Sequence, residues 1–142
     1  MVTTTHSQNP RILRGRCYCG SMQYEVADEF EYAANCHCSD CRRATGSAFK
    51  PFAGIAREKL RVVEGYESTL IFGDVAANHD VHCGVCGSFM FSVLNQGTRL
   101  HLTLGTLEDA PSIRPTAHIF VGDKAPWYQI TDLLPQYEGH VT

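Results

Sequence analysis

The sequence lacks a long apolar run, a block of basic residues and a low-complexity linker. Its apolar stretches fall far short of the ~20 residues that span a bilayer, and residues 1–15 hold no apolar segment of signal-peptide length. Its 12 Lys and Arg residues are outnumbered by 15 Asp and Glu, so the formal net charge is −3. Because nucleic-acid binding normally needs a basic stripe, we expect a cytoplasmic protein that binds neither nucleic acid nor membrane.

Length and composition predict one globular domain. The chain has 142 residues, of which 44% are hydrophobic and 19% charged, so it is long enough to bury a core of its own. No Ser-, Gly- or Pro-rich linker divides it. We expect a flexible polar tail over residues 1–11 and a single zinc-binding domain over residues 12–142. The oligomeric state is left open, and a homodimer is among the states allowed.

Strand signals dominate and helix signals are scarce. Short β-favouring runs separated by turn residues predict an antiparallel, mainly β fold. The predicted strands cover residues 21–26, 48–55, 60–65, 68–73, 79–83, 88–94, 99–107 and 117–122. Alternation in the strand 99–107 predicts two faces, one with Leu100, Leu102 and Leu104 and the other with Arg99, His101 and Thr103. Pro51 is expected to place part of the second strand at a sheet edge. Short helical turns are predicted over 39–46, 56–60 and 131–137, the first capped by Ser39 and ended by Gly46.

Seven cysteines form three groups, two of which are pairs followed by glycine, CYCG and CGVCG. In a reducing compartment such groups favour metal ligation or catalysis over disulfides. Glycine lets the chain turn tightly where backbone N–H groups point at thiolate sulfur. The pairs Cys17 with Cys19 and Cys83 with Cys86 therefore predict one closed, structural zinc site. The alternative is that these residues are small buried hydrophobic groups or redox thiols.

The third group, CHCSDC, contains the remaining Cys36, Cys38 and Cys41. Three thiolates leave one tetrahedral position free, which is typical of a reactive zinc site. A metal held by three sulfurs suits a fourth sulfur from an exogenous thiol, kept there as the nucleophilic thiolate. Two alternatives stay open: His37 closes the site as a fourth ligand, or one of these cysteines joins the first zinc and the others are inert.

The cysteine groups and their surroundings resemble a known family. The segments GRCYCGSMQYEV, NCHCSDCRRATGSAF, VHCGVCGSFMF and HIFVGDKAPWYQITDLLPQY are similar to those of glutathione-dependent formaldehyde-activating enzymes, a family that includes centromere protein V. The resemblance covers about residues 13–138. It implies a β-tent fold of small coiled antiparallel sheets around two zinc ions, a structural zinc on the flanking pairs and a catalytic-type zinc on the central three cysteines. The implied activity is carbon–sulfur lyase chemistry that forms or cleaves S-(hydroxymethyl)glutathione and so detoxifies formaldehyde.

Polar residues beside the central cysteines are candidates for binding a small-molecule thiol and aldehyde. Arg42, Arg43 and Lys50 could pair with glutathione carboxylates, whereas the alternative for each is a solvated surface. Thr45 and Gly46 could donate hydrogen bonds to a peptide-like ligand, unless this stretch simply ends a helix.

Two residues late in the chain complete the list of substrate-binding candidates. His118 could shuttle a proton to the hemithioacetal oxygen, and the alternative is a structural histidine with satisfied ring nitrogens. Trp127 is the single tryptophan and is expected in the core or in a pocket wall.

Three functions are compatible with these residues. The first is a zinc-dependent carbon–sulfur lyase acting on glutathione–aldehyde adducts. The second is a non-enzymatic zinc module that binds a protein partner, with both zinc ions structural. The third is the same chemistry on another thiol or aldehyde, because fold and metal do not fix the substrate.

Overall fold

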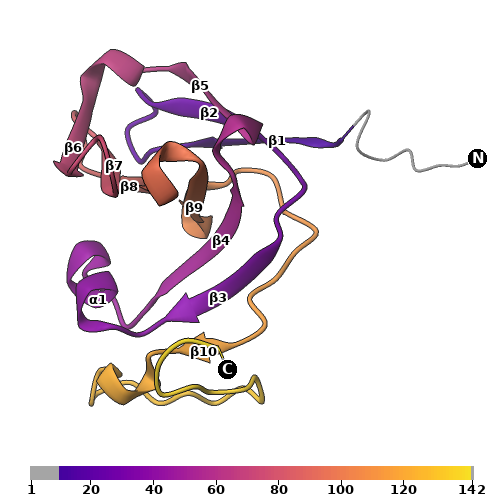
Figure 1. The fold of residues 1–142 in the computed structure, drawn as a ribbon, viewed down its shortest axis with the longest axis vertical. Coiled ribbons are helices and arrows are strands. Elements are labelled where there is room, and N and C mark those ends of the chain that lie inside the picture. The colour runs from indigo at the N-terminus through magenta and orange to yellow at the C-terminus, as the bar shows by residue number, and fades with distance from the viewer. Residues whose placement is uncertain (1–9, 142) are drawn as a thin grey trace, which may run out of the picture.

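The computed structural model describes residues 10–141, which form two β-sheets (Figure 1). The smaller sheet has the order β1–β2–β5 and the larger one β10–β3–β4–β9–β8–β7–β6. The strands are β1 (Ile12–Arg16), β2 (Gln23–Ala27), β3 (Tyr32–Cys36), β4 (Lys50–Ala56), β5 (Leu60–Glu64), β6 (Thr69–Gly73), β7 (His79–Cys83), β8 (Phe89–Leu94), β9 (Arg99–Thr103) and β10 (His118–Ile119). The pairs are antiparallel except that β10 runs parallel to β3. The prediction of a mainly β fold is confirmed.

Helical structure in the described range is short. It consists of α1 (Ser39–Thr45) and the 3-10 turns η2 (Arg57–Lys59), η3 (Tyr66–Ser68), η4 (Asn95–Gly97), η5 (Leu104–Thr106) and η6 (Val121–Asp123). Gly46 ends α1 in the left-handed conformation, as predicted. The cap is Cys38 rather than Ser39, because Cys38 Sγ accepts a hydrogen bond from the Cys41 N–H at 3.3 Å. No helix in residues 10–141 is long and apolar enough to cross a membrane.

Several sequence-based boundaries were wrong. The strands predicted from the sequence do not include β1 or β3. The β3 segment YAANC lacks the β-branched residues that mark a strand. Residues 131–137 form no helical turn, since this segment runs beside β10, where the Tyr137 N–H donates to the His118 carbonyl at 2.9 Å. The expectation for Pro51 holds locally: β4 lies between β3 and β9, but Pro51 pairs only with β3. Its missing N–H is tolerated where pairing with β9 has not yet begun.

The N-terminal boundary also needs correction. Residues 1–9 of the expected tail lie outside the described residues, but Arg11 is already part of the folded domain. Its carbonyl accepts from the Asp28 N–H at 2.8 Å, and its guanidinium pairs with the Asp28 carboxylate at 3.1 Å. The domain therefore includes the residue before β1.

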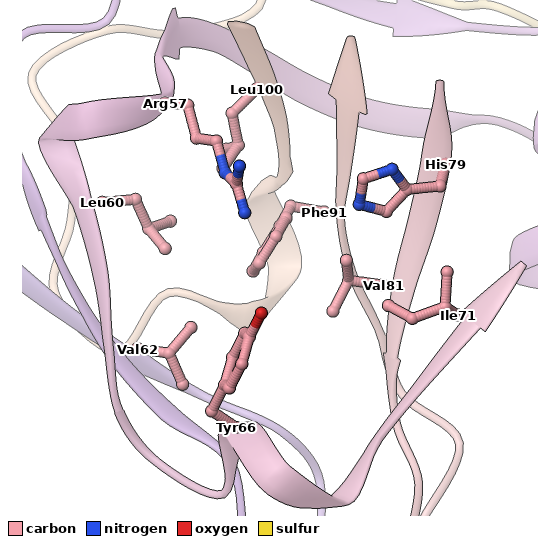
Figure 2. A pocket seen from close by; sticks show the side chains of 9 residues that line it. All are labelled: Arg57, Leu60, Val62, Tyr66, Ile71, His79, Val81, Phe91 and Leu100. Atoms are coloured by element: carbon pink, nitrogen blue, oxygen red, sulfur yellow. The ribbon is translucent and has the colours of Figure 1, made fainter. Parts of the chain in front are cut away.

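The main hydrophobic core lies between the two sheets. Leu13 and Tyr24 from the smaller sheet pack against residues of the larger one, including Ile55, Val93 and Leu102. Alternation along β9 buries Leu100 and Leu102 and turns His101 to the opposite face. A gap of about 250 Å³ lies in this interface. The ring of His79 and the side chain of Tyr66 are directed into it (Figure 2). No cysteine lines this gap, although Cys17 and Cys83 of the flanking pairs belong to the main core.

Candidate functional site

The first cysteine cluster joins the turn after β1 to the turn after β7. Its ligand atoms, one from each of four cysteines, all lie within 4.8 Å of one another; the residues are Cys17, Cys19, Cys83 and Cys86. The measured sulfur–sulfur distances include 3.7 Å between Cys17 and Cys19 and 3.9 Å between Cys19 and Cys83. A tetrahedral zinc with Zn–S bonds of about 2.3 Å requires sulfur separations of about 3.8 Å. The four thiols therefore fit a closed zinc site.

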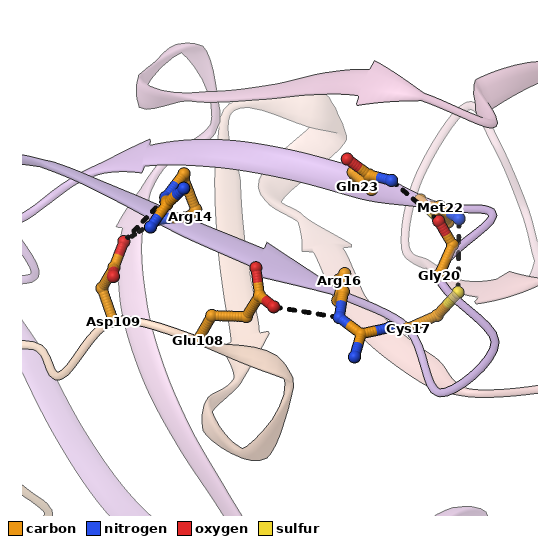
Figure 3. Close-up of polar contacts among 8 residues, drawn as sticks. All are labelled: Arg14, Arg16, Cys17, Gly20, Met22, Gln23, Glu108 and Asp109. Atoms are coloured by element: carbon orange, nitrogen blue, oxygen red, sulfur yellow. Dashed lines mark hydrogen bonds and ion pairs between the residues drawn. The ribbon is translucent and has the colours of Figure 1, made fainter.

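Backbone geometry around this cluster favours thiolates. The Met22 N–H donates to Cys17 Sγ at 3.2 Å (Figure 3). Two N–H groups of the second turn donate to Cys83 Sγ at 3.4 Å. Gly20 and Gly87 both adopt φ near +83°, the left-handed conformation that glycine tolerates. Hydrogen bonds to an ionised sulfur stabilise that form. The glycine after each pair thus serves the turn that the sequence predicted.

Ion pairs brace β1 beside the cluster (Figure 3). Arg14 Nε lies 3.4 Å from the Asp109 carboxylate, which also accepts from the Arg14 backbone N–H at 2.8 Å. Arg16 Nε lies 2.9 Å from the Glu108 carboxylate. These contacts attach the segment after η5 to the strand that leads into the first cysteine pair.

The second cluster lies where β3 ends and α1 begins. Its three sulfurs, from Cys36, Cys38 and Cys41, also fall within 4.8 Å of one another. Cys36 is the last residue of β3, whereas Cys38 caps the helix whose first turn contains Cys41. The Cys41 thiol hydrogen-bonds to Cys36 and lowers the pKa of Cys36, and the same contact raises the pKa of Cys41. Cys36 is therefore the most easily ionised of the three thiols, and the thiolate is the form that binds a metal ion.

His37 faces away from these sulfurs. It is fully buried, its Nε2 lies 2.8 Å from His118 Nδ1, and its ring packs on Phe49 with centroids 4.9 Å apart. Burial and the charge of nearby groups lower the pKa of His37 to about 4, so the imidazole is neutral. His37 belongs to neither group of metal-ligating side chains in residues 10–141. The alternative in which His37 closes the second site is therefore disfavoured.

A cavity of about 690 Å³ adjoins the second cluster. Cys36 and Cys41 form part of its wall, and the floor is the face of the larger sheet opposite to the core. Residues around β10 and the C-terminal residues His140 and Val141 line the other side. In Figure 1 this C-terminal segment runs beside β10, at the end of the molecule away from the smaller sheet. Two of the three cysteines, Cys36 and Cys41, thus border a space that can hold a small molecule.

Lys50 lies at the boundary between the cluster and the cavity. It pairs with Cys36 across the β3–β4 ladder and is buried, with Nζ 4.0 Å from the centre of the Phe89 ring. Burial lowers the pKa of Lys50, and the neighbouring thiols and Asp80 oppose that shift. No carboxylate in residues 10–141 lies within 4.0 Å of its ammonium. The neighbouring cysteine sulfurs and Asp80 are therefore the groups that offset the charge of this buried cation.

Comparison with known proteins is consistent with this geometry. The family model for glutathione-dependent formaldehyde-activating enzymes matches residues 12–123. The chain belongs to this family. A protein of Halomonas elongata that is named, provisionally, as a glutathione-dependent formaldehyde-activating enzyme is 25% identical over 127 residues, which cover 84% of this chain and 81% of the relative. A Rhodobacter sphaeroides protein of known crystal structure is similar with a TM-score of 0.57 and 25% identity, covering 70% of this chain and 92% of its own.

The two arginines predicted beside the site of this family member do not face the cavity. Arg42 Nε donates to the Asp123 carbonyl at 3.1 Å and ties α1 to η6. Arg43 is exposed and lines a different hollow, together with Leu70 and Phe72 of β6. Successive residues of a helix point about 100° apart, so the two guanidinium groups diverge. The structure therefore does not bring the two side chains together at one cavity.

Thr45 and Gly46 complete the helix rather than the cavity. The Thr45 hydroxyl donates to the Cys41 carbonyl at 2.7 Å and contacts the Ser47 hydroxyl at the same distance. Gly46 occupies the left-handed C-cap position. The alternative that this stretch ends a helix is confirmed.

His118 and Trp127 also lie outside the cavity lining. Both ring nitrogens of His118 are bonded, one to His37 and the other to the Asp132 carboxylate at 2.9 Å. A substrate would have to displace one of these partners, so the structure supports the structural alternative for His118. Trp127 is 70% exposed, and the expectation of a core or pocket position is wrong.

Sequence reasoning missed the aromatic part of the cavity. Tyr32 and Phe52 line it, together with His101 and with Phe120 after β10. The sequence indicated only part of this lining. The alternation of residues 99–107 correctly placed His101 on the face opposite to the buried leucines. That pattern did not reveal that a second wall covers the same face.

Proposed function

We propose that the three-cysteine cluster joins a thiol to an aldehyde and cleaves the resulting adduct, with glutathione as the thiol. One observation carries the proposal: a cluster of three thiols has no fourth protein ligand in residues 10–141, and two of them, Cys36 and Cys41, line a cavity. The family name, which refers to glutathione and formaldehyde, supports a glutathione-dependent, aldehyde-directed enzyme. The carbon–sulfur lyase class and the role of zinc are part of this proposal.

The donor set indicates zinc, which prefers thiolate ligands and four-coordination. Cys36, Cys38 and Cys41 would hold it, and the bound ion would supply Lewis acidity that keeps an incoming thiol ionised at neutral pH. The four-cysteine cluster would hold a second zinc with a purely structural role. The chain then contributes a rigid loop, because Cys36 is fixed in β3 and Cys38 is fixed as the cap of α1.

The reaction is a balanced addition. The thiol gives its proton to solvent, its sulfur bonds to the carbonyl carbon, and the π electrons of the C=O bond move to oxygen, which takes a proton. The product is a hemithioacetal, and the reverse sequence cleaves the carbon–sulfur bond. Lys50 would stabilise the negative charge that develops on oxygen, because its buried ammonium lines the same cavity.

Calorimetric titration of the zinc-loaded protein with glutathione tests the proposal. Wild-type protein is expected to bind glutathione at one site, and a Cys38→Ser variant is expected to lose that binding. Serine is a favoured helix cap, so this variant removes a thiol and keeps the cap. A wild type that does not bind glutathione, or a variant that binds it equally well, would contradict the proposal and leave the non-enzymatic zinc module.

A further inference from the structure

We propose that the cavity beside the three-cysteine cluster is a specificity pocket for an apolar group larger than formaldehyde, carried by the aldehyde partner of the adduct. The inference rests on the proposed function for the location of the reacting carbon. The chemistry of the substrate is inferred from the shape of the cavity and from the residues that line it. The favoured aldehyde is therefore an aryl or bulky alkyl aldehyde.

The strand register builds an apolar track that leads away from the cysteines. On one face of the sheet, Cys36 lies opposite Lys50, Ala34 opposite Phe52, and Tyr32 opposite Gly54. Ala34, Cys36, Phe52 and Ile119 pack as one hydrophobic cluster. The small side chain of Ala34 leaves space over this face, so an apolar group could extend from the thiols along the track.

Aromatic rings form the far part of the track. Phe52 and His101 are stacked, with ring centroids 4.5 Å apart, and Tyr32 meets both edge-on. The Tyr32 hydroxyl lies 2.8 Å from His101 Nε2, so these two polar groups satisfy each other. The surface they offer to a ligand is therefore mainly ring carbon, which favours an aryl group.

The size of the cavity does not suit formaldehyde alone. A volume of about 690 Å³ is within the usual range for pockets that hold drug-sized molecules. Formaldehyde has one carbon and is comparable to one or two water molecules, each of which takes about 30 Å³ in the liquid. A one-carbon aldehyde would leave most of the apolar surface in contact with water, so the pocket would contribute little to its binding.

Charge excludes glutathione itself as the occupant. Glutathione carries two carboxylates and an ammonium, and burying these groups without partners is costly. Lys50 is the one Lys or Arg residue in the described lining, and burial lowers the pKa of His101 to about 4, so that imidazole is neutral. The charged ends of glutathione would remain in solvent, and the apolar space is left for the aldehyde substituent.

Binding of unreactive alcohols tests the pocket separately from catalysis. Benzyl alcohol and methanol mimic the two sizes of aldehyde, and their affinities would be measured by calorimetry or ligand-observed NMR. Wild-type protein is expected to bind benzyl alcohol at least about tenfold more tightly than methanol, because more apolar surface leaves water. Equal affinity for the two alcohols would overturn the inference.

Variants locate the binding in the track. Ala34→Leu fills the space and Phe52→Leu removes an aromatic surface, and each is expected to weaken benzyl alcohol binding at least about fivefold. Val75→Ala, at an exposed position in the β6–β7 turn, is the control and is expected to bind as wild type does. Thermal unfolding would identify a variant that fails to fold. If Ala34→Leu or Phe52→Leu fails to fold, the affinity of the other variant tests the inference. A folded Ala34→Leu or Phe52→Leu variant with wild-type affinity would overturn the inference.

Turnover then assigns the apolar group to one partner. Exchange rates would be measured by NMR for glutathione with benzaldehyde, glutathione with formaldehyde, and phenylmethanethiol with formaldehyde. Ala34→Leu is expected to lower the benzaldehyde-to-formaldehyde rate ratio at least about fivefold. An unchanged ratio, or a loss confined to phenylmethanethiol, would overturn the assignment to the aldehyde. If no pair is turned over while benzyl alcohol binds as expected, the proposed function fails and the apolar pocket stands.

Discussion

The two cysteine clusters use the same ligand chemistry in contrasting surroundings. The four-cysteine cluster draws its ligands from two turns far apart in the chain, as the contact between Cys19 and Cys83 shows. The three-cysteine cluster takes its ligands from residues 36–41 and faces a cavity of about 690 Å³. The first therefore constrains the fold, whereas the second is locally built and accessible to a ligand.

This contrast separates stability from chemistry. A metal that crosslinks distant segments contributes its binding energy to folding, because the unfolded chain has no preformed site. A metal held within six consecutive residues closes a short loop and adds less to the whole fold. Mutations in the four-cysteine cluster should therefore mainly lower stability, whereas mutations in the three-cysteine cluster should mainly lower activity.

The largest effect is expected from Cys83→Ser. Loss of one thiolate opens the four-cysteine site and removes the crosslink between β1 and β7, so the melting temperature should fall by roughly 20 °C or more. Differential scanning calorimetry of the purified protein, with zinc content determined in parallel, measures this. A melting temperature within a few degrees of the wild-type value would contradict the structural role of this cluster.

Cys38→Ser should show the reverse profile. The serine keeps the cap of α1, so the melting temperature should change by less than about 5 °C. Hemithioacetal exchange with glutathione should fall at least about 100-fold, because the ligand set for the second metal is incomplete. Calorimetry and NMR exchange rates on the same sample compare the two quantities. Equal losses of stability in the Cys38→Ser and Cys83→Ser variants would remove the distinction between the clusters.

Lys50→Met should weaken metal retention in the second cluster alone. The buried ammonium offsets the negative charge of the three thiolates, so its loss should lower metal affinity there by about tenfold. Competition with a chromophoric chelator measures the two metal affinities separately, the weaker one expected at the three-cysteine cluster and the stronger one at the four-cysteine cluster. Lys59→Met, which breaks the partly buried pair with Glu29, is the matched control. A change in the metal affinity of the stronger site, or equal changes in the Lys50→Met and Lys59→Met variants, would contradict the charge balance assigned to Lys50.

The smallest effect is expected from Asp132→Asn, behind the three-cysteine loop. Hydrogen bonds from His118 and from the Leu134 N–H hold the pKa of Asp132 below its ordinary value. The ionised carboxylate thus stabilises the fold above the unfolded-state pKa of about 3.9, and this contribution is lost as the pH falls through the lower folded-state pKa. The variant should melt about 3 °C below wild type at pH 7 and match it in strong acid. Melting curves across this pH range that differ by a constant amount would contradict the assignment.

Spacing in the sequence was enough to predict the cysteine groups. The glycine after each flanking pair indicated a tight turn, and both glycines adopt the left-handed conformation. Alternation in residues 99–107 correctly predicted which side of β9 is buried. These features depend on residues that are close together in the sequence, so local sequence patterns are enough to predict them.

Contacts between distant segments could not be predicted in this way. The cavity depends on the C-terminal segment lying over the outer face of the sheet, and the bond between His37 and His118 joins residues 81 apart. Proximity in sequence was misleading for Arg42 and Arg43, because adjacent helical residues point in different directions. Trp127 was misjudged because composition predicts burial on average and not for one residue.

X-ray absorption at the zinc edge tests the central claim most directly. If one metal has four sulfur ligands and the other has three, protein loaded with two zinc ions should average 3.5 sulfurs per metal. Addition of glutathione should raise this average to four, with Zn–S distances near about 2.3 Å. An average that does not change with glutathione, or one that is already four without it, would contradict an open three-cysteine site.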